Sequence, residues 1–291
     1  PVPGTDTPLG PYPTVVRNKE GKTVLIVQAS SYSKYLGNIT ILYDNVGNIM
    51  NWSGAPVFLD TKLPQDEAIN QELVPWKEEV DHQGNKIIGS TLVRLEQNSC
   101  STTECLIGNF ITDAMVFEYT KSPEPGSWTD GSIAVINAIG LRSGIDIGNI
   151  TYNDIAMAQP FKNTIDLAEI EGKHLKEIFE SSVSARNRDL LQVSGVKIIY
   201  NLTMAEGSRV TSLRLRCREC DVPVYEDLDE TKMYRIILPS FLADGGLGFT
   251  LFEKYLKHRT RGELDINLFV DYIERRSPVF QEIEGRIVIN T

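Results

Sequence analysis

The first 60 residues carry two predicted β-hairpins but too little chain for a hydrophobic core of their own. Apolar strands joined by turns rich in Asn and Gly run from Val15 to Val27 and from Ile39 to Met50. Isolated two-stranded hairpins are marginally stable in water unless they pack on something else. These hairpins must therefore pack on the rest of the chain, on another chain or on a partner that the sequence does not contain.

A predicted helix follows the hairpins and separates them from a region of different character. It is expected from Asp66 to about Asp81, with acidic residues in its first turn, where they suit the helix dipole. Pro75 lies inside the helix and is expected to kink it or to split it in two. A single helix between a β-rich region and a mixed region is typical of a linker between domains.

Strand and helix patterns alternate after residue 85, without an internal repeat, and predict an α+β (mixed α/β) fold. Strands are expected over residues 87–95, 132–137, 164–170, 193–201, 209–216, 234–238 and 286–290. Helices are expected over residues 106–119, 153–158, 172–183, 247–256 and 267–274.

The charge balance excludes some partners. The 29 Lys and Arg residues against 39 Asp and Glu give a net charge of −10, which argues against binding to nucleic acid. No apolar run approaches the ~18 residues that a membrane span needs, so no membrane partner is expected. Two basic clusters, residues 186–188 and 257–261, are interpreted as solvated loops, with a small-anion site as the alternative.

The four cysteines form two close pairs, Cys100 with Cys105 and Cys217 with Cys220. An even number of cysteines in short local loops is typical of disulfides in an oxidising compartment. Two alternatives stay open. The second pair can be a redox pair, because Arg218 beside it favours a thiolate, and all four cysteines can form a zinc site.

Four Asn-x-Ser/Thr sequences match the acceptor pattern for N-glycosylation. The pattern is common by chance, but together with the paired cysteines it indicates a secreted, extracellular glycoprotein. The acceptor residues are Asn38, Asn51, Asn149 and Asn201.

Five segments carry a more specific signal through their order and spacing. They are residues 33–37 (SKYLG), the run from Cys100 to Met115, and residues 141–146 (LRSGID), 159–161 (QPF) and 237–246 (ILPSFLADGG). Together they resemble the C-terminal part of the secreted 5′-nucleotidase/apyrase family over nearly the whole chain. By that resemblance, both cysteine pairs are family disulfides.

The resemblance also implies a domain organisation. In that family an N-terminal metallophosphoesterase domain holds two metal ions, which activate water for attack on phosphorus. A linker helix joins it to a nucleoside-binding domain, and rotation about the helix carries substrate to the metals. Residues 1–63 then resemble a β-hairpin remnant of the metal domain, residues 64–84 the linker helix, and residues 85–291 the nucleoside-binding domain. Most of the metal domain is expected to lie outside this sequence.

The histidine inventory leads to the same expectation independently. The sequence has three histidines, His82, His174 and His258, and none stands in an Asp-x-His or Gly-Asn-His setting. A two-metal phosphatase needs several His and carboxylate ligands that converge. We therefore expect no catalytic residue, no metal site and no cofactor in this chain. Two divalent metals would enter only with the missing N-terminal domain.

The resemblance assigns four residues to a nucleoside site. Phe161 and Phe241 match the two rings that sandwich the base, and a purine between two rings stacks on both faces. Asn137 matches a hydrogen-bond partner of the base. Arg142 matches a contact to ribose or phosphate, for which a guanidinium offers a planar fork of donors. Without the resemblance, both Phe side chains are interpreted as core residues and Arg142 as a surface turn residue.

Three departures from the family pattern affect this site. Leu247 stands where the family has an Asp that accepts hydrogen bonds from ribose, and Ser101 replaces an Arg. Ala138 and Ile139 add side chains where the family has glycines. The loss of one charged hydrogen-bond partner costs about 1.5–3 kcal/mol. Two such losses predict nucleotide binding that is weaker by ~100-fold or more.

Two hypotheses for function follow. The first is a secreted, non-catalytic relative that binds an adenine nucleoside or nucleotide, or a host haemostatic or cell-surface protein. It would modulate haemostasis or platelet activation, as in the saliva of blood-feeding arthropods, where apyrases of this family occur. The second is the C-terminal fragment of an active hydrolase of extracellular ATP, ADP or AMP. Its separate metal-binding piece, or self-association, would cover residues 1–60. A thiol oxidoreductase that uses Cys217 and Cys220 is a distant third.

Overall fold

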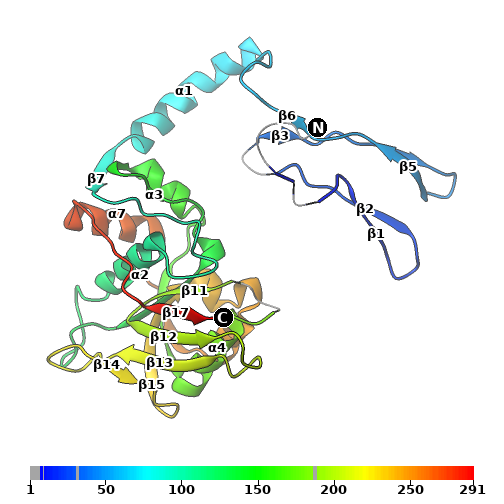
Figure 1. Cartoon of the computed structure of the whole chain (residues 1–291). Coiled ribbons are helices and arrows are strands. Elements are labelled where there is room, and N and C mark those ends of the chain that lie inside the picture. Colours follow the sequence, from blue (N-terminus) through cyan, green and yellow to red (C-terminus); the bar gives the residue numbers. More distant parts are fainter. Residues whose placement is uncertain (1–6, 9, 31–32, 186–188) are drawn as a thin grey trace. The chain divides into compact units, whose positions relative to one another are not determined.

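The computed structural model describes residues 7–8, 10–30, 33–185 and 189–291, so the basic cluster predicted at residues 186–188 lies outside the described residues. The chain divides into two units (Figure 1). Unit 1 is Pro1–Trp76 and unit 2 is Lys77–Thr291. Each unit is described by itself below. The finer division into a hairpin remnant, a linker helix and a nucleoside-binding domain stays a prediction.

In its described residues, unit 1 contains three antiparallel sheets of two strands each, visible in blue in Figure 1, followed by the first part of a helix. The pairs are β1 (Thr14–Arg17) with β2 (Thr23–Ile26), β3 (Tyr35–Leu36) with β6 (Val57–Phe58), and β4 (Thr40–Tyr43) with β5 (Ile49–Ser53). Both hairpins that the sequence predicts are present. The β3–β6 pair was not predicted, because strands of two residues are too short to show an alternating pattern.

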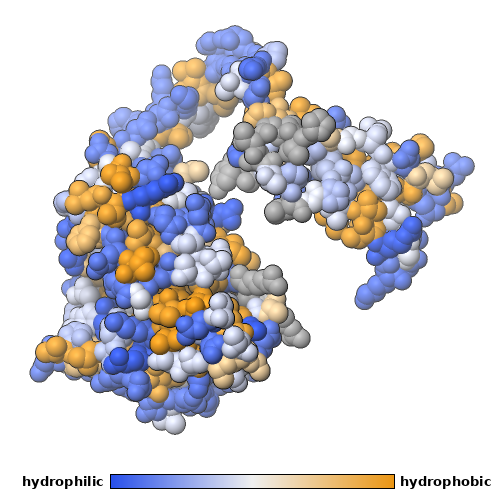
Figure 2. All heavy atoms as spheres, in the orientation of Figure 1, coloured by the Kyte–Doolittle hydropathy of each residue, from blue (hydrophilic) through white to orange (hydrophobic). Residues whose placement is uncertain are grey.

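The hairpins of unit 1 have no hydrophobic core of their own. Among the described residues 7–76, Pro13 alone is buried. Large apolar side chains such as Val15, Ile26 and Leu42 are exposed, and Figure 2 shows hydrophobic residues on the surface of this unit. This exposure follows from the sheets themselves, because a two-stranded sheet has no second layer against which to bury a face.

Helix α1 (Glu67–Gly84) begins as the sequence predicts and ends three residues later, at Gly84. The Asp66 Oδ1 atom accepts hydrogen bonds from the backbone N–H groups of Ala68 and Ile69, at 2.9 and 3.1 Å. Pro75 lies inside this one continuous helix, so the predicted split does not occur. A proline removes a single backbone hydrogen bond, and the bonds on either side hold the helix together.

Unit 2 has the predicted mixed α/β fold, built on a sheet of five strands in the order β11–β8–β15–β10–β16. The strands are β8 (Ile133–Asn137), β10 (Ile165–Glu171), β11 (Leu191–Ser194), β15 (Met233–Pro239) and β16 (Lys257–Thr260). Strands β8 and β15 are parallel, and every other neighbouring pair is antiparallel.

Hydrophobic cores cover both faces of this sheet, as alternate residues of β8 show. Ala134 and Ile136 belong to one core, whereas Ile133 and Val135 belong to the other. The first core contains residues of α2 (Leu106–Glu118), α3 (Tyr152–Ala158) and α7 (Asp265–Arg276). The second contains residues of α4 (Gly172–Ser182), α5 (Ser240–Ala243) and α6 (Thr250–Tyr255).

A second sheet completes the unit, with four strands in the order β14–β13–β12–β17. The strands are β12 (Val196–Asn201), β13 (Val210–Arg216), β14 (Tyr225–Asp227) and β17 (Ile287–Asn290). A two-stranded pair, β7 (Ile87–Thr91) with β9 (Gly148–Thr151), lies apart from both sheets. The predicted strand over residues 87–95 is therefore shorter than expected.

Gly195 divides the single strand that the sequence predicts over residues 193–201. Strand β11 ends at Ser194 and β12 begins at Val196, and the two strands belong to different sheets. Gly195 has φ of +70°, and a Cβ atom there would lie 1.8 Å from the carbonyl oxygen of Ser132. Only glycine fits this position without strain, so the residue lets the chain cross from one sheet to the other.

Two further predictions near the C-terminus are wrong in detail. The helix expected over residues 247–256 begins at Thr250, and the short 3₁₀ turn η2 (Gly246–Gly248) precedes it. Leu247 in that turn has φ of 51°, which no right-handed helix allows. The basic residues 257–261, expected as a loop, form the edge strand β16 up to Thr260.

Candidate functional site

One edge of the five-stranded sheet brings together three of the four predicted site residues. Asn137 ends β8, Phe241 lies in α5 directly after β15, and Phe161 precedes β10. Strands β8 and β15 are parallel, and β10 runs antiparallel to β15 with Ile165 opposite Pro239. The ends of β8 and β15 and the start of β10 therefore meet at the same edge.

The fourth predicted residue, Arg142, lies beside Phe161. It follows the 3₁₀ turn η1 (Ala138–Gly140) at the end of β8. Its guanidinium carbon is 6.0 Å from the centroid of the Phe161 ring, at the outer limit of a cation–π contact. The backbone N–H of Arg142 donates a hydrogen bond to the carbonyl of Ala158 at 3.0 Å, which joins this loop to the end of α3.

Both phenylalanine rings are accessible. Phe161 is 53% exposed and Phe241 is 44% exposed, so the alternative that these residues belong to the core is wrong. Exposed aromatic side chains that lie at one sheet edge are available to stack on a planar ligand. Their role as a base clamp stays a prediction.

Asn163, which the sequence did not single out, holds Phe241 in place. Its Oδ1 atom accepts hydrogen bonds from the backbone N–H of Phe241 at 3.3 Å and from Ser240 Oγ at 3.2 Å. Its own backbone N–H donates to Asp265 Oδ2 at 2.9 Å. Because Asn163 is two residues from Phe161, the same short segment carries one ring and positions the other. In the sequence, the only signal for this role of Asn163 was its position two residues after Phe161.

Asp189 is a second residue that sequence reasoning missed. Asn137 is only 3% exposed, and its Nδ2 atom donates to Asp189 Oδ2 at 3.0 Å. Asp189 Oδ1 accepts from the backbone N–H of Ile139 at 2.9 Å. Burial raises the pKa of Asp189, while these hydrogen bonds oppose the shift. The carboxyl group thereby fixes the orientation of the Asn137 amide and the turn that follows it.

Leu247 lies in the turn next to Phe241, with 45% of its surface exposed. A Cβ atom on the neighbouring Gly246 would be 2.5 Å from the Phe241 ring, so this turn packs closely on the aromatic side chain. The aliphatic Leu247 side chain has no hydrogen-bonding group. A polar ligand at this edge would therefore gain no side-chain hydrogen bond from position 247.

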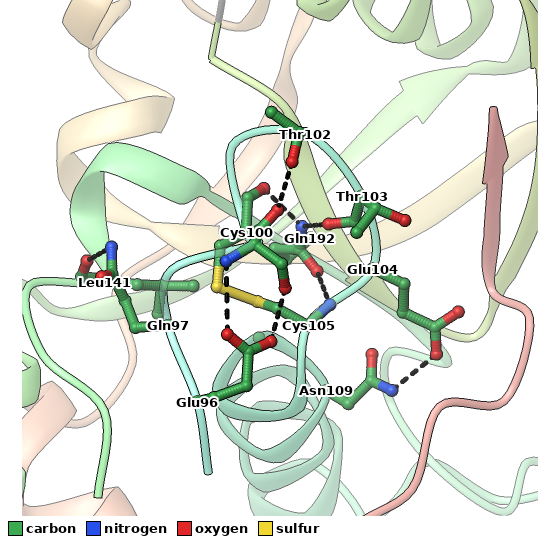
Figure 3. The surroundings of a disulfide bond; sticks show 12 residues. Glu96, Gln97, Cys100, Thr102, Thr103, Glu104, Cys105, Asn109, Leu141 and Gln192 are labelled. Carbon is green, nitrogen blue, oxygen red and sulfur yellow. Dashed lines mark hydrogen bonds between the residues drawn. A yellow bond between two sulfur atoms is a disulfide. The ribbon is translucent and has the colours of Figure 1, made fainter. Parts of the chain in front are cut away.

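The Cys100–Cys105 disulfide closes a loop that is anchored to the central sheet (Figure 3). Gln192 on β11 donates through Nε2 to the carbonyls of Cys100 and Thr103, at 2.7 and 2.8 Å. Its Oε1 atom accepts from the backbone N–H of Cys105 at 3.1 Å. Gln97 donates to the carbonyl of Leu141 at 2.9 Å, so the loop also contacts the segment before Arg142.

The second cysteine pair, Cys217 with Cys220, is also a disulfide. Both pairings are those that the family resemblance implied, and they replace the alternative of a four-cysteine zinc site. No free cysteine occurs in the part of the chain that the structure describes. Within the described residues, no group of three or more His, Cys, Asp and Glu side chains gathers as a metal ion would require.

The three histidines lie in separate places. His82 is in the last turn of α1, and His174 on α4 stacks on Tyr255 with ring centroids 3.5 Å apart. His174 Nδ1 also lies 3.1 Å from Glu177 Oε2. His258 belongs to strand β16 and not to a loop.

The middle residue of the basic segment 257–261, Arg259, is not free to bind an external anion. Arg259 Nε lies 2.7 Å from Asp166 Oδ2, and Asp166 is completely buried. A second ion pair joins Arg259 to Asp244. Two carboxylates therefore already pair with the Arg259 guanidinium, and the buried Asp166 needs this charged partner.

The glycosylation acceptors differ in accessibility. Asn38, Asn51 and Asn149 are exposed, whereas Asn201 is half-buried and its Oδ1 accepts from Thr203 Oγ1 at 2.7 Å. Within the described residues, no helix combines the length and the apolar character that a bilayer crossing requires.

Comparison with known proteins identifies the family. The family described as "5′-nucleotidase, C-terminal domain" matches residues 87–254. An apyrase of Tabanus yao is 42% identical over 99% of this chain and 53% of its own length. The 5′-nucleotidase of Homo sapiens is 35% identical over 99% of this chain and 52% of its own length.

A solved structure agrees with the sequence matches. The 5′-nucleotidase precursor from Thermus thermophilus has a TM-score of 0.76 and 30% identity, covering 98% of this chain and 55% of that one. The chain thus spans about half the length of the relatives that it matches. It belongs to the 5′-nucleotidase family and contains the family's C-terminal domain.

Proposed function

We propose that residues 85–291 bind an adenine nucleoside or nucleotide at the sheet edge that carries Asn137, Arg142, Phe161 and Phe241. The observation that carries the proposal is the exposure of both Phe rings at the edge where Asn137 ends β8. Stacking on two rings suits a purine base. The Asn137 amide uses Nδ2 to bind Asp189, which leaves its Oδ1 atom as the acceptor for the base, and Arg142 supplies a cation for ribose or phosphate oxygens.

Affinity at this site is expected to be modest. Leu247 gives no acceptor for ribose hydroxyls, and Ser101 gives no cation. Two missing charged contacts at about 1.5–3 kcal/mol each weaken binding by ~100-fold or more, relative to a site that has both.

The chain by itself then acts as a secreted binding protein and not as a hydrolase. Two disulfides and three exposed glycosylation acceptors support an extracellular setting. In such a setting, for example in saliva, capture of ADP would reduce platelet activation and modulate haemostasis. A host haemostatic or cell-surface protein is the alternative target.

A second candidate function is favoured by unit 1. Its described residues 7–76 bury only Pro13, and the relatives are about twice as long as this chain. A metal-holding piece that packs on the hairpins of residues 1–60 would cover their apolar side chains. The nucleotide held by unit 2 would then be hydrolysed at metal ions of that piece, as ATP, ADP or AMP.

Calorimetric titration of the full chain with adenosine and with ADP tests the binding site. We expect saturable binding that is lost in the Phe161→Ala/Phe241→Ala variant. Phe280→Ala is the matched control, because Phe280 is 68% exposed and lies outside the site. Absence of heat with every nucleoside, or equal loss in the control, would reject the proposed site.

Phosphate release from ATP, ADP and AMP with added divalent metal separates the two functions. Binding without turnover, by a preparation whose intact mass shows this chain alone, supports the binding protein. Turnover that depends on a second polypeptide in the native material supports the hydrolase fragment. Turnover by this single chain would contradict both.

A further inference from the structure

Three hydrogen-bond donors at the end of β8 are used inside the protein. The backbone N–H of Ala138 donates to the carbonyl of Leu190 at 3.0 Å, and that of Ile139 donates to Asp189 Oδ1 at 2.9 Å. The Nδ2 atom of Asn137 donates to Asp189 Oδ2 at 3.0 Å. These donors are therefore engaged before any ligand arrives.

The oxygen of the Asn137 amide is open in contrast. Among the described residues, the buried side-chain polar atoms without a partner are Asn109 Oδ1 and Arg216 Nε. Asn137 Oδ1 is not one of them and accepts no hydrogen bond from the described part of the chain, so it reaches the protein surface. A Cβ atom on Gly140 would lie 2.9 Å from this oxygen, so the glycine leaves it uncovered. The end of β8 thus offers an acceptor to a ligand.

Asp189 decides which end of the Asn137 amide faces outward. An ionised carboxylate can only accept hydrogen bonds, so the group of Asn137 that faces it must be the NH₂ group. Strand pairing sets the position of Asp189, because Leu191, two residues later, lies opposite Asn137 in the β11–β8 pair. Asp189 is only 2% exposed, and the backbone N–H of Ile139 holds its other oxygen. The amide therefore has one orientation, with Oδ1 towards the ligand.

The other residues of the proposed nucleoside site cannot distinguish one purine from another by hydrogen bonding. Phe161 and Phe241 offer apolar rings, and every base has a face that stacks on a ring. Leu247 has no hydrogen-bonding group, and Arg142 carries only donors, which suit ribose or phosphate oxygens. Among these residues, selection between purines therefore depends on the amide of Asn137.

We propose that Asp189 is a positioning residue that makes the nucleoside site selective for bases with an amino-group donor, such as the 6-amino group of adenine. The inference rests on the proposed function, because it requires that the base meets Asn137. The 6-amino group donates a hydrogen bond to the fixed Oδ1 atom. A purine without this donor would cover the same oxygen and leave it without a partner, which weakens binding.

Adenosine and purine riboside test this selectivity, because the two nucleosides differ only in the 6-amino group. They share the ribose and the stacking surface, and the base of purine riboside carries no N–H donor. In calorimetric titrations of the full chain, adenosine should bind about tenfold or more tightly than purine riboside. Dissociation constants for the two nucleosides that agree within about twofold would overturn the proposal.

Asp189→Asn tests the positioning role with almost no change of shape. The oxygen of the new amide should accept from the backbone N–H of Ile139, which cannot turn away. Its NH₂ group then faces Asn137, so the Asn137 amide must turn over and present Nδ2 to the ligand. Ring nitrogens of both nucleosides accept from this donor, so the ratio of their dissociation constants should fall to within about twofold. A preference for adenosine that stays at its parent value would overturn the role of Asp189.

Asp227→Asn is the matched control. It removes the same charge from β14, where the Asp227 side chain is 92% exposed, and it should leave the ratio of the two dissociation constants unchanged. General damage to the fold lowers the affinity for both nucleosides together, so the ratio reports selection and not stability. An equal fall of the ratio in Asp227→Asn and Asp189→Asn would show a response to net charge alone, and the proposal would then be wrong.

Asn137→Ala gives a second test that leaves Asp189 in place. Without the amide oxygen, the preference for adenosine should fall to within about twofold, and a preference that persists would show that another group recognises the amino group and would overturn the proposal. The outcomes for the unaltered chain separate this inference from the proposed function. Absence of binding by either nucleoside rejects the nucleoside site and the inference with it, whereas equal binding of both keeps the site and rejects the selectivity alone.

Discussion

Replacing Gly195 by alanine is expected to cost unit 2 about 3–5 kcal/mol of its free energy of unfolding. The φ angle of +70° alone costs an alanine about 1–2 kcal/mol. The new Cβ atom would also lie 1.8 Å from the carbonyl oxygen of Ser132 and 2.8 Å from its carbonyl carbon. These are backbone atoms that cannot rotate away, so β8 and the β11–β12 connection must separate, at about 2–3 kcal/mol.

Gly207→Ala is the matched control. Gly207 has φ of +83°, but no heavy atom lies within 4 Å of the position that a Cβ atom would take. This variant should lose only the conformational part, about 1–2 kcal/mol. The difference between the two variants, about 2–3 kcal/mol, measures the collision with Ser132.

Urea unfolding followed by Trp128 fluorescence in the Trp52→Phe/Trp76→Phe background reports unit 2 specifically. A loss in Gly195→Ala that equals the loss in Gly207→Ala would show that the backbone relaxes freely around residue 195. The view of Gly195 as the obligatory crossing point between the two sheets would then be refuted.

Two further predictions concern buried carboxyl groups. Arg259→Met should destabilise the protein by about 3–5 kcal/mol in urea unfolding, because the fully buried Asp166 loses its ion pair. The Asp166→Asn/Arg259→Met double variant should recover at least about half of that loss. No recovery would contradict the view that the unpaired Asp166 carboxylate causes the loss. Burial raises the pKa of Asp189 above the ordinary 3.8, so the folded protein binds this proton more tightly than the unfolded chain does. The stabilising contribution of this proton is therefore full below pH 3.8 and is lost as the pH rises through the raised pKa of Asp189. The difference in unfolding free energy between Asp189→Asn and the parent should change between pH 3.8 and that raised pKa. A difference that stays constant with pH would show that Asp189 does not titrate in this way.

Hydrophobic periodicity predicts the long helices and strands of unit 2 well. It fails where the backbone conformation of a single residue ends or redirects an element. Helix α2 and strand β8 have continuous apolar patterns in the sequence, and the structure places both elements where the sequence predicts them. Gly195 and Leu247 instead interrupt apolar patterns that look continuous. Both residues have positive φ angles, and at Gly195 the backbone of Ser132, 63 positions away in the sequence, approaches so closely that only glycine fits, which no local pattern records.

The candidate site divides in the same way. The resemblance selected Asn137, Arg142, Phe161 and Phe241, and the topology explains why three of them share one sheet edge. It did not select the polar residues that support them. Asp189 meets Asn137 across 52 positions of sequence, and Asn163 meets Phe241 across 78. Such partners become visible only when the strands are paired.

The open strands of unit 1 have a practical consequence. Within the residues that the structure describes, the sheets β1–β2 and β4–β5 have only two strands each, so each of these four strands has one edge with no neighbouring strand in the same sheet. Edges of this kind template the addition of foreign strands, and exposed valines and leucines beside them strengthen the attachment. A polypeptide cut after Trp76 would therefore be prone to aggregate, and solubility screens should keep the hairpins joined to whatever covers them.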